Sequence, residues 1–572
     1  MAFPTLILSS SPTSPLFLLF FSCLTHPNYS FNPHSTPPTL KSSKSLLVSM
    51  FLEPSSLTMS SSYSSFFLLF LSLLFFPCLS QSLRGVLIDC GAAVDSIVNE
   101  QRWVSDAGFV SAGTPKNLTV EVLDSTLSTV RTFPSNNNVF KKFCYEVPVY
   151  RGGKYLVRTT YFYGGVNGNS NPPVFDQIVD GTFWSPVNTT EDYWHGMSSY
   201  YEGIFKAIGK TMSVCLAANS YTDSDPFISA LELVLVSDSL YNSTDFNTYA
   251  LTLIARSSFG NNGSIIRYPD DEFDRYWEPY GRYSPAESFR HVSVSGIWNH
   301  PPAKVFQTRF ALRKLEAMEL LWPPAPLPNA TYYIALYFAD DQLSFSGRAF
   351  NISINDILFY ANLNVTPTGM VVFASQWPLA GITKITLTPL FGSSIGPLIN
   401  AGEVFEVLPV GGKTHTRDVI ALERLKESFK NPPPDWNGDP CLPPQYPWTG
   451  VTCAGGTRIR VTSLNLTSLG LSGSISPSIA KLTALNGIWL ANNNLTGSIP
   501  DLSSLNNLQS LHLEDNQLSG EIPPSLGNIN SLNEIFLQNN NLSGQVPSNL
   551  LGKPGLNLRT TPGNPLLSQP PK

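Results

Sequence analysis

The sequence predicts a mainly β protein, in which tandem β-sandwiches are followed by a short α/β leucine-rich-repeat solenoid. The first observation is a repeat near the C-terminus, whose four copies begin at Leu464, Ile488, Leu511 and Ile535. Their spacing of 24, 23 and 24 residues lies within the period of about 20–29 residues that is typical of leucine-rich repeats. The second observation is the stretch 84–408, where short β-branched and aromatic runs alternate with Gly, Pro and Asn and no long helical pattern intervenes.

Each copy of the repeat follows the pattern L-x-L-x-x-N-x-L-x-G-x-I-P. We expect L-x-L to form a short strand whose leucines point into the stack and whose x residues point outward. Asn493, Asn516 and Asn540 hold the N position, where a side-chain amide can bond to backbone groups at the corner after the strand. The first copy has Leu469 there. Because one copy cannot bury its apolar face alone, the copies are expected to stack and to present an extended concave surface for partners.

The outward-facing residues of successive strands predict where a partner binds. One column contains Trp489, His512 and Phe536, and the next contains Glu514 and Gln538. Large aromatic side chains that the repeat geometry directs toward solvent are typical of a contact surface. The alternative is that the upstream domain covers part of this surface.

An N-terminal cap is predicted before the repeats. Apolar residues recur at helical spacing from Asp418 to Phe429, and Pro432 to Pro434 end that helix. Cys441 and Cys453 follow within DWNGDPCLPPQYPWTGVTC, and we expect them to form a disulfide. The alternatives are two free thiols or half of a zinc site, but no second cysteine pair or histidine cluster lies nearby.

The stretch 84–408 consists of two halves that echo each other. YLVRTTYFYGG and FISALELVLV in the first half correspond to YYIALYFADD and LINAGEVFEVLPV in the second. In each half the closing strand follows a P-x-I-x-A phrase, at Pro226 to Ala230 and at Pro397 to Ala401. We therefore expect two sandwiches of similar design.

Several features of the termini and the cysteines predict secretion. The apolar run at 66–76 suits the core of a signal peptide, which we place at 59–82 after an unstructured extension at 1–58. A plastid transit peptide is the alternative for that extension. We expect Cys144 to pair with Cys215, and we expect a disordered tail at 559–572 without a membrane anchor. After the predicted leader, ten sequons for N-glycosylation occur, at Asn117, Asn188, Asn242, Asn262, Asn329, Asn351, Asn364, Asn465, Asn494 and Asn541.

Composition and motifs argue against catalysis and against nucleic-acid binding. Charged residues make up 13% of the chain and the net charge is −6, so no basic footprint is present. We find no phosphate-binding loop, kinase signature or metal-ligand spacing, and we predict neither a cofactor nor a metal. GSSIG at 392–396 matches a nucleophile-elbow pattern, but Pro397 follows directly where a helix is needed. A secreted carbohydrate-active enzyme remains the alternative.

The motifs resemble those of plant receptor proteins. W-x-GDPC followed by W-x-GV-x-C is similar to the N-terminal cap of plant extracellular leucine-rich-repeat receptors. RGVLIDCGA at Arg84, FDQIVDGTFW at Phe175, YPDDEFDRYWEP at Tyr268 and FNISINDILFY at Phe350 resemble the tandem malectin-like region of such receptors. The chain thus resembles the malectin-like, leucine-rich-repeat receptor-like proteins, in particular the kinase-less receptor-like protein 4 type. This resemblance places malectin-like subdomains at 83–240 and 241–410, the cap at 414–455 and about four repeats at 456–558.

The resemblance also implies a ligand site in the malectin-like region. Malectin binds a diglucose with aromatic side chains and an acidic residue, because sugar C–H faces stack on rings while carboxylates accept hydroxyl protons. The corresponding candidates here are Tyr161, Tyr163, Trp184, Asp274, Tyr276, Trp277, Tyr337 and Asp341. The alternatives are that these aromatics are core residues and that a ligand binds in the cleft between the two halves. The implied function is extracellular recognition in the plant cell wall, with a wall glycan, a secreted peptide or a membrane receptor kinase as the partner.

Overall fold

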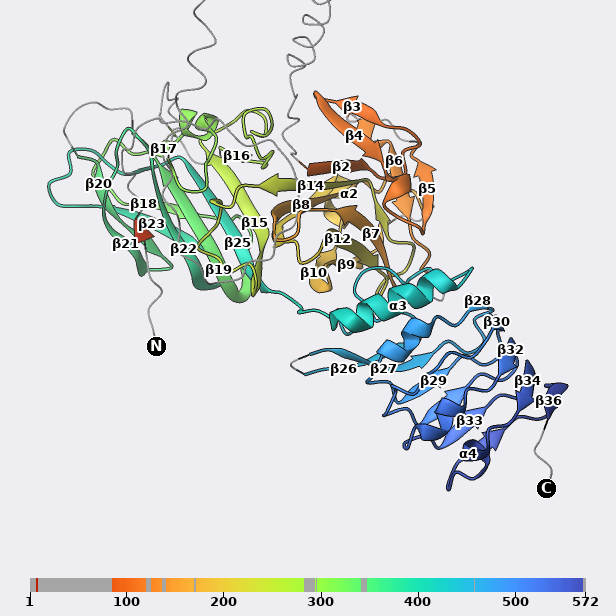
Figure 1. Ribbon diagram of the computed structural model, residues 1–572. Helices are drawn as coiled ribbons and strands as arrows, with labels where there is room; N and C mark the ends of the chain where they lie inside the picture. Colours follow the sequence, from red (N-terminus) through yellow and green to blue (C-terminus); the bar gives the residue numbers. More distant parts are fainter. Residues whose placement is uncertain are drawn as a thin grey trace, which may run out of the picture. The chain divides into compact units, whose positions relative to one another are not determined.

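The computed structural model describes residues 7–8, 85–119, 125–135, 140–168, 171–281, 294, 296–340, 347–456 and 458–568. The elements below belong to one compact unit, formed by Met1–Ser10 and Arg84–Lys572 (Figure 1). The expected signal peptide at 59–82 lies outside the described residues. So does the extension at 1–58, apart from strand β1 (Ile7–Leu8), which pairs with Phe373 and Val372. No helix among the described residues is long and apolar enough to cross a bilayer.

One large sheet runs through both halves of the β region. Its order is β22-β19-β25-β15-β11-β8-β14-β2-β4-β3, where the strands are Met370–Gly381, Leu327–Phe338, Ala401–Pro409, Tyr249–Phe259, Ser199–Lys206, Lys154–Tyr161, Ala230–Val236, Gly85–Asp89, Gln101–Ser105 and Ser96–Val98. The halves meet at β11 and β15, where Gly203 pairs with Thr252 and Ile204 with Leu251. The two expected sandwiches therefore share a continuous sheet instead of meeting as separate bodies.

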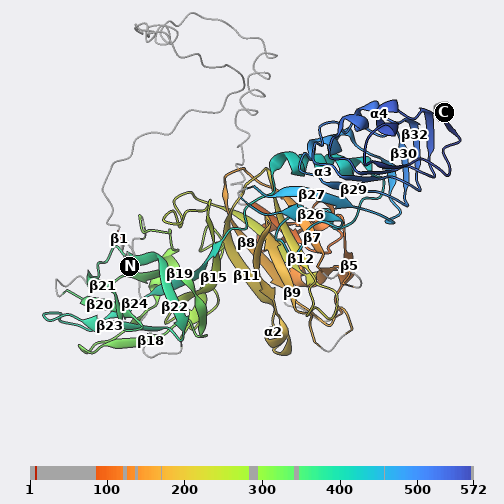
Figure 2. The same ribbon diagram turned by 90° about the horizontal axis from the view of Figure 1, so that it is seen from below.

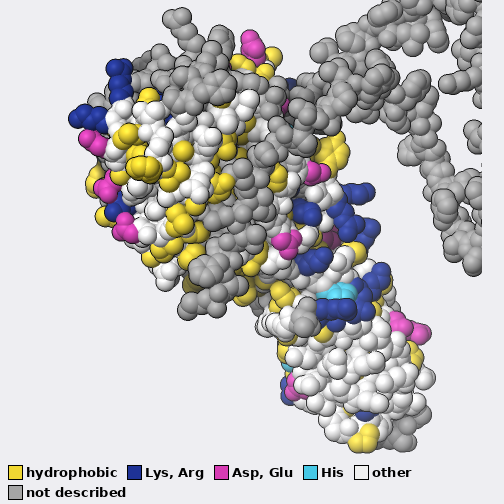
Figure 3. All heavy atoms as spheres, turned by 90° about the vertical axis from the view of Figure 1, so that its left-hand side faces the viewer, with side chains coloured by type: hydrophobic (Ala, Val, Ile, Leu, Met, Phe, Trp, Pro, Cys, Tyr) yellow, Lys and Arg dark blue, Asp and Glu magenta, His cyan; other side chains and the backbone are white. Residues whose placement is uncertain are grey.

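Each half adds a four-stranded sheet of its own. In the first half the order is β10-β9-β12-β7, formed by Thr182–Val187, Phe175–Val179, Thr211–Ala217 and Lys142–Pro148. In the second half it is β18-β23-β20-β21, formed by Met318–Leu321, Lys384–Pro389, Ala349–Ile354 and Ile357–Asn364. Apolar residues between these sheets and the large sheet form two separate cores. Figure 3 shows apolar side chains on the second half, and the exposed ones near the end of its small sheet include Leu321, Ile357, Leu358 and Ile382.

The two P-x-I-x-A phrases mark the point where the chain passes from one sheet to another. β13 (Phe227–Ile228) pairs with β6 (Thr129–Thr132), and the chain enters the large sheet as β14 one residue later. β24 (Leu398–Ile399) pairs with β17 (Phe310–Ala311) and leads into β25 in the same way. The residue between β24 and β25 is the buried Asn400. Its side chain accepts a hydrogen bond from Ala339 N at 2.7 Å and donates one to Thr308 O at 3.0 Å. The duplication seen in the sequence is therefore a duplication of this strand crossing.

The repeats form two parallel ladders. One sheet, β27-β29-β31-β33-β35, comprises Arg460–Asn465, Gly487–Trp489, Ser510–His512, Glu534–Phe536 and Asn557–Arg559. The other, β28-β30-β32-β34-β36, comprises Ser472–Ser474, Asn494–Gly497, Gln517–Glu521, Asn541–Gln545 and Leu566–Ser568. Figure 2 shows the coils stacked one after another. The strand leucines Leu466, Leu490, Leu513 and Leu537 are buried in one continuous core.

Two expectations about the C-terminal end are wrong. We placed about four repeats at 456–558 and a disordered tail from residue 559, but β35 and β36 build a fifth coil that is described through Ser568. Asn564 takes the asparagine position of this coil, accepting from Leu542 N at 2.9 Å and donating to Leu537 O at 2.9 Å. Residues 559–568 of this segment are ordered because β35 and β36 pair with the preceding coil.

The cap joins the repeats to the first half. Helix α3 (Thr416–Ser428) buries Ala421, Leu422 and Leu425 in the repeat core, and β26 (Val451–Ala454) extends the first ladder. The structure pairs Cys441 with Cys453, and it also pairs Cys144 with Cys215 across β7 and β12. Cys90 is a buried free thiol.

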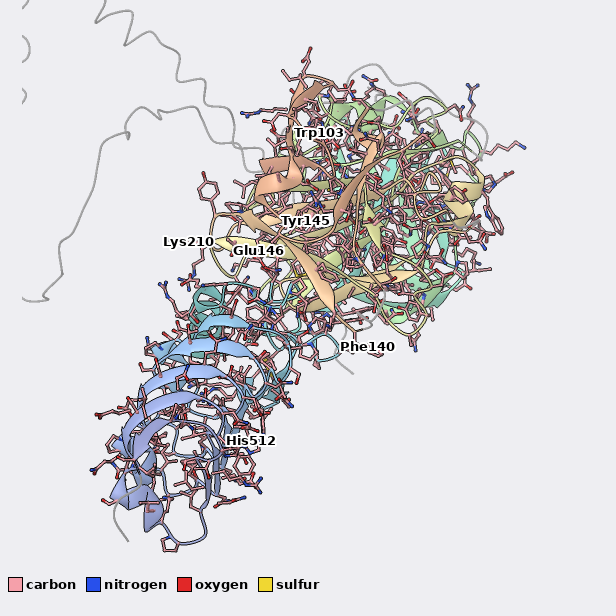
Figure 4. All side chains as sticks on the ribbon, turned by 90° about the vertical axis from the view of Figure 1, so that its right-hand side faces the viewer. Trp103, Phe140, Tyr145, Glu146, Lys210 and His512 are labelled. Atoms are coloured by element: carbon pink, nitrogen blue, oxygen red, sulfur yellow. A yellow bond between two sulfur atoms is a disulfide. The ribbon has the colours of Figure 1, made fainter. Side chains whose placement is uncertain are left out.

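The contact between the cap and the first half is polar and closely packed. Lys142 donates to the carbonyl oxygens of Asp439, Leu442 and Tyr446 at 2.7, 2.6 and 2.5 Å. Glu146 accepts from Gly438 N at 2.6 Å, and Tyr446 donates to Asp176. Figure 4 shows Glu146 at the end of the first half that meets the cap. A cavity of about 480 Å³ beside this contact is lined by residues that include Glu146, Asp180, Lys413 and Lys426.

Candidate recognition surface

A ladder of side chains runs across the strands of the repeat sheet. The parallel register places Asn465 beside Trp489, Trp489 beside His512, His512 beside Phe536 and Phe536 beside Arg559. Adjacent strands lie about 4.8 Å apart, so the same position in successive coils brings side chains into contact. Trp489, His512 and Phe536 are each partly exposed. We call Trp489, His512, Phe536 and Arg559 the concave ladder.

The members of the concave ladder contact one another. The rings of Trp489 and His512 meet edge-on at 6.0 Å, and those of His512 and Phe536 stack at 4.3 Å with an interplanar angle of 27°. The Arg559 guanidinium lies 4.4 Å from the centre of the Phe536 ring. Among the described residues, every ring contact and ion pair of these four side chains lies within the repeats. The alternative that the upstream domain covers the ladder therefore receives no support from these contacts.

The sequence did not reveal two residues that shape this ladder. Arg559 falls in the predicted tail, although the segment LNLR at 556–559 repeats the strand pattern. Gly487 has no side chain, and a Cβ built there would come within 1.9 Å of the Trp489 indole. The indole thus lies over the strand position that Ser463 and Ser510 occupy in the neighbouring coils.

Carboxylates flank the middle of the ladder. His512 Nε2 lies 3.3 Å from Glu534 Oε2, and His512 Nδ1 lies 4.0 Å from Glu514 Oε1. The second oxygen of Glu514 is buried without a hydrogen-bond partner among the described residues, and so is Gln538 Oε1 in the next coil. The surface that the sequence predicted is therefore aromatic along one column and acceptor-rich along the next.

Five of the malectin-type candidates are aromatic side chains buried in two cores of the β region, whereas a sugar-binding platform is exposed. Tyr161, Tyr163, Trp184, Trp277 and Tyr337 are each at most 3% exposed. The first three pack in the core of the first half. The other two lie on the opposite face of the large sheet, in a core that loop segments cover. The burial of these five rings favours the alternative that they are core residues.

The remaining malectin-type candidates take part in a buried charge network or lie outside the described residues. Asp274 accepts two hydrogen bonds from Arg267, at 3.1 and 2.9 Å. The Tyr276 ring lies 3.5 Å from the Arg158 guanidinium and 4.5 Å from that of Arg267. Asp341 lies outside the described residues.

One small pocket does combine aromatic side chains with a carboxyl group. It measures about 140 Å³, and its lining includes Trp103, Tyr200, Tyr276, Glu232 and Arg267. Burial raises the pKa of Glu232 to about 7, and its Oε2 accepts from Arg158 at 2.9 Å. Of the sequence candidates only Tyr276 lines this pocket. The sequence did not indicate Trp103, Tyr200 and Glu232 because they lie on strands β4, β11 and β14, which only the fold brings together.

The predicted glycosylation sites are accessible for the most part. Nine of the ten sequon asparagines are exposed, while Asn351 is partly buried and accepts from Asn362 N at 2.8 Å. Asn465 is exposed at the start of the concave ladder, beside Trp489. Among the described residues, no group of three or more His, Cys, Asp or Glu side chains is arranged to hold a metal ion.

Comparison with known proteins identifies the class. Residues 88–407 match the malectin-like domain family, residues 415–454 match the leucine-rich-repeat N-terminal domain, and residues 507–529 match a leucine-rich repeat. The chain therefore belongs to the malectin-like family and combines that domain with leucine-rich repeats, as the motifs indicated.

Its relatives are plant receptor-like kinases. The chain is 34% identical over 464 residues to a "probable LRR receptor-like serine/threonine-protein kinase" of Arabidopsis thaliana. The alignment covers 75% of this chain and 48% of that protein. It is 30% identical over 433 residues to a leucine-rich repeat receptor-like serine/threonine-protein kinase of the same plant, with 71% and 48% covered. The chain thus spans about half the length of the curated relatives it matches. Among solved structures, the extracellular domain of ANXUR2 from Arabidopsis thaliana aligns with a TM-score of 0.48 at 16% identity, covering 56% of this chain and 96% of that one.

Proposed function

We propose that this protein is an extracellular recognition protein, whose concave ladder binds an extended peptide segment of a secreted peptide or of a membrane receptor kinase. The observation that carries the proposal is the stacked, partly exposed set Trp489, His512 and Phe536, which continues into Arg559. Aromatic and arginine side chains dominate the binding energy of protein interfaces because they bury a large area with little loss of conformational freedom. The domains of the relatives agree with recognition outside the cell.

A second candidate is binding of a wall glycan in the pocket lined by Trp103, Tyr200 and Tyr276. The pocket of about 140 Å³ combines these three aromatic side chains with the carboxyl group of Glu232, which are the groups that stack on a sugar ring and accept its hydroxyl protons. Glycoside hydrolysis needs two carboxyl groups that flank the bond. Glu232 is the one carboxylic residue among the described residues that line this pocket, so we propose binding there and not catalysis.

The test is a binding selection on the purified, secreted chain. A displayed library of random extended peptides is enriched on the wild-type protein and on the variant Trp489→Ala/Phe536→Ala. We expect peptides whose affinity falls at least about tenfold with this variant, as is common for central aromatic contacts. Leu551→Ala is the matched control, because Leu551 is an exposed apolar residue of α4 (Ser548–Leu551), away from the ladder.

The outcomes separate the two candidates. Peptides that bind wild type and the Leu551→Ala variant equally, but not the ladder variant, support peptide recognition. If no peptide distinguishes the ladder variant from wild type, the peptide proposal fails. The glycan candidate is tested with an array of wall oligosaccharides, where binding must fall with Trp103→Ala and remain with the ladder variant.

A further inference from the structure

The geometry points to a lysine or arginine side chain as the group of the partner peptide that the concave ladder recognises. This inference rests on the proposed function of peptide binding. The ammonium or guanidinium group of this side chain would be held by Glu514, with Gln538 and Glu534 nearby, while its aliphatic stem lies along the aromatic rings. Three features of the surface carry this inference.

The first feature is a pair of acceptors without donors. Glu514 Oε2 and Gln538 Oε1 are buried and have no hydrogen-bond partner among the described residues, although they occupy equivalent positions in adjacent coils. A buried acceptor without a partner costs free energy, which a bound donor recovers. A carboxylate oxygen accepts hydrogen bonds, so a group that pairs with Glu514 is a donor, and the side chain is 15% exposed, so a partner at the surface can reach it when it turns outward. Ammonium and guanidinium groups present three and five such donors.

The second feature is the balance of charge. Glu514 and Glu534 flank His512, with side chains that are 15% and 41% exposed. Arg559 is the permanent cation of the concave ladder, and it lies at the far end over Phe536. A carboxylate of a partner would meet two like charges beside His512, whereas a cation would meet two opposite ones. Charge complementarity of this kind selects among partners even where it adds little affinity.

The third feature is the contact between Arg559 and Phe536. The guanidinium lies 4.4 Å from the ring centre, so the ladder already accommodates a cation against one of its aromatic rings. Trp489 and His512 continue the same column toward the first coil, and among the described residues no cation lies over the Trp489 ring. A lysine or arginine of the partner would contact the ring of Trp489 or His512, one or two coils before Phe536, as Arg559 contacts the ring of Phe536.

The test uses peptides selected from the random library for dependence on Trp489 and Phe536. Each lysine of such a peptide is replaced by norleucine and each arginine by citrulline, which keep the length of the side chain and remove its charge. We expect one of these replacements to weaken binding at least about tenfold, the scale of a charge-assisted hydrogen bond. The protein variant Glu514→Gln should weaken the charged peptide similarly and leave the norleucine or citrulline peptide almost unchanged, which shows that the two groups interact.

The outcomes distinguish this inference from the function on which it rests. If ladder-dependent peptides lack a basic residue, or bind equally well after its charge is removed, the inference is overturned while peptide recognition stands. If no peptide depends on the ladder, both fail. Should Glu514→Gln not fold, as judged by thermal unfolding, the peptide replacements and Glu534→Gln decide the question on their own.

Discussion

The ammonium group of Lys142 donates a hydrogen bond of 2.5 Å to the carbonyl oxygen of Tyr446, and so connects the first β half to the cap of the repeats. Burial lowers the pKa of Lys142 to about 8, so the group carries its charge below that pH. Two further carbonyl oxygens of the cap loop accept from the same nitrogen. One side chain thereby fixes a loop that the Cys441–Cys453 disulfide also constrains.

Removing this ammonium should uncouple the cap from the first half. Lys142→Met keeps the stem but leaves three carbonyl oxygens without their donor, and we expect a loss of about 2–4 kcal/mol in the association of the two parts. In differential scanning calorimetry we expect two transitions for the variant and one for wild type. Lys210→Met is the control, because Lys210 is exposed and lies beside Thr211, at the opposite end of the β7–β12 pairing from Lys142. Figure 4 shows Lys210 at the surface of the first half. A single transition at the wild-type temperature would contradict the role assigned to Lys142.

Stability should depend on pH through Asp180. Burial raises the pKa of Asp180 to about 7 from 3.8, and the charge of Glu146 adds to the shift. The folded state therefore holds this proton more tightly than the unfolded state. The resulting stabilisation is complete below pH 3.8 and is lost as the pH rises through about 7.

Asp180→Asn should remove this part of the pH dependence. Asn tolerates the positive φ of 45° at this turn and has no charge to desolvate. We expect the melting temperature of the variant to exceed that of wild type by a few degrees more at about pH 8 than at about pH 5. Thermal unfolding at both pH values measures the difference. Parallel curves for the two proteins would show that Asp180 is not the titrating group.

The asparagines of the repeats should carry a large share of the stability of the solenoid. Asn516 donates to Leu490 O at 2.9 Å and accepts from Leu495 N at 3.0 Å, both inside the stack. Asn516→Ala leaves these buried backbone groups unpaired, so we expect a loss of about 2–4 kcal/mol in the free energy of unfolding. Urea unfolding measures it, with the exposed Gln517→Ala as the matched control. Equal losses for the two variants would refute the assigned role.

Trp489 should lose its place when Gly487 gains a side chain. The backbone of Gly487 is not in the left-handed region, so alanine is compatible with the strand, but its Cβ would meet the indole at 1.9 Å. We expect Gly487→Ala to change the tryptophan fluorescence and to weaken ladder-dependent peptides about tenfold, with a stability change within about 1 kcal/mol. Ser463→Ala, at the same position one coil earlier, is the control. Unchanged peptide binding would mean that the indole is not part of the contact.

The repeats could be predicted from the sequence because each position has one physical role. A leucine that leaves the stack loses about 1.5–3 kcal/mol of burial, so the period constrains every coil. The fifth coil was missed because Thr560 stands where Leu537 stands one coil earlier, and because Asn564 follows Arg559 by five residues instead of four. These two departures break the pattern while the backbone pairing continues.

The ligand candidates of the β region could not be read in the same way. Alternation along a strand predicts which residues face a core only when one face of the sheet meets solvent. Here both faces of the large sheet are covered, so Tyr161 and Tyr337 are buried on opposite sides of it. Trp103 and Glu232, which line the small pocket, are brought together by pairings between distant strands that no local pattern reveals.

Gly203 pairs with Thr252 and Ile204 pairs with Leu251, so β11 and β15 join the two halves of the β region in one sheet. A chain shortened to either half would leave the strand at that seam with unpaired amide and carbonyl groups, and such an open edge recruits other molecules into aggregates. We therefore expect either half, when produced alone, to need a substitute strand at this seam in order to stay monomeric.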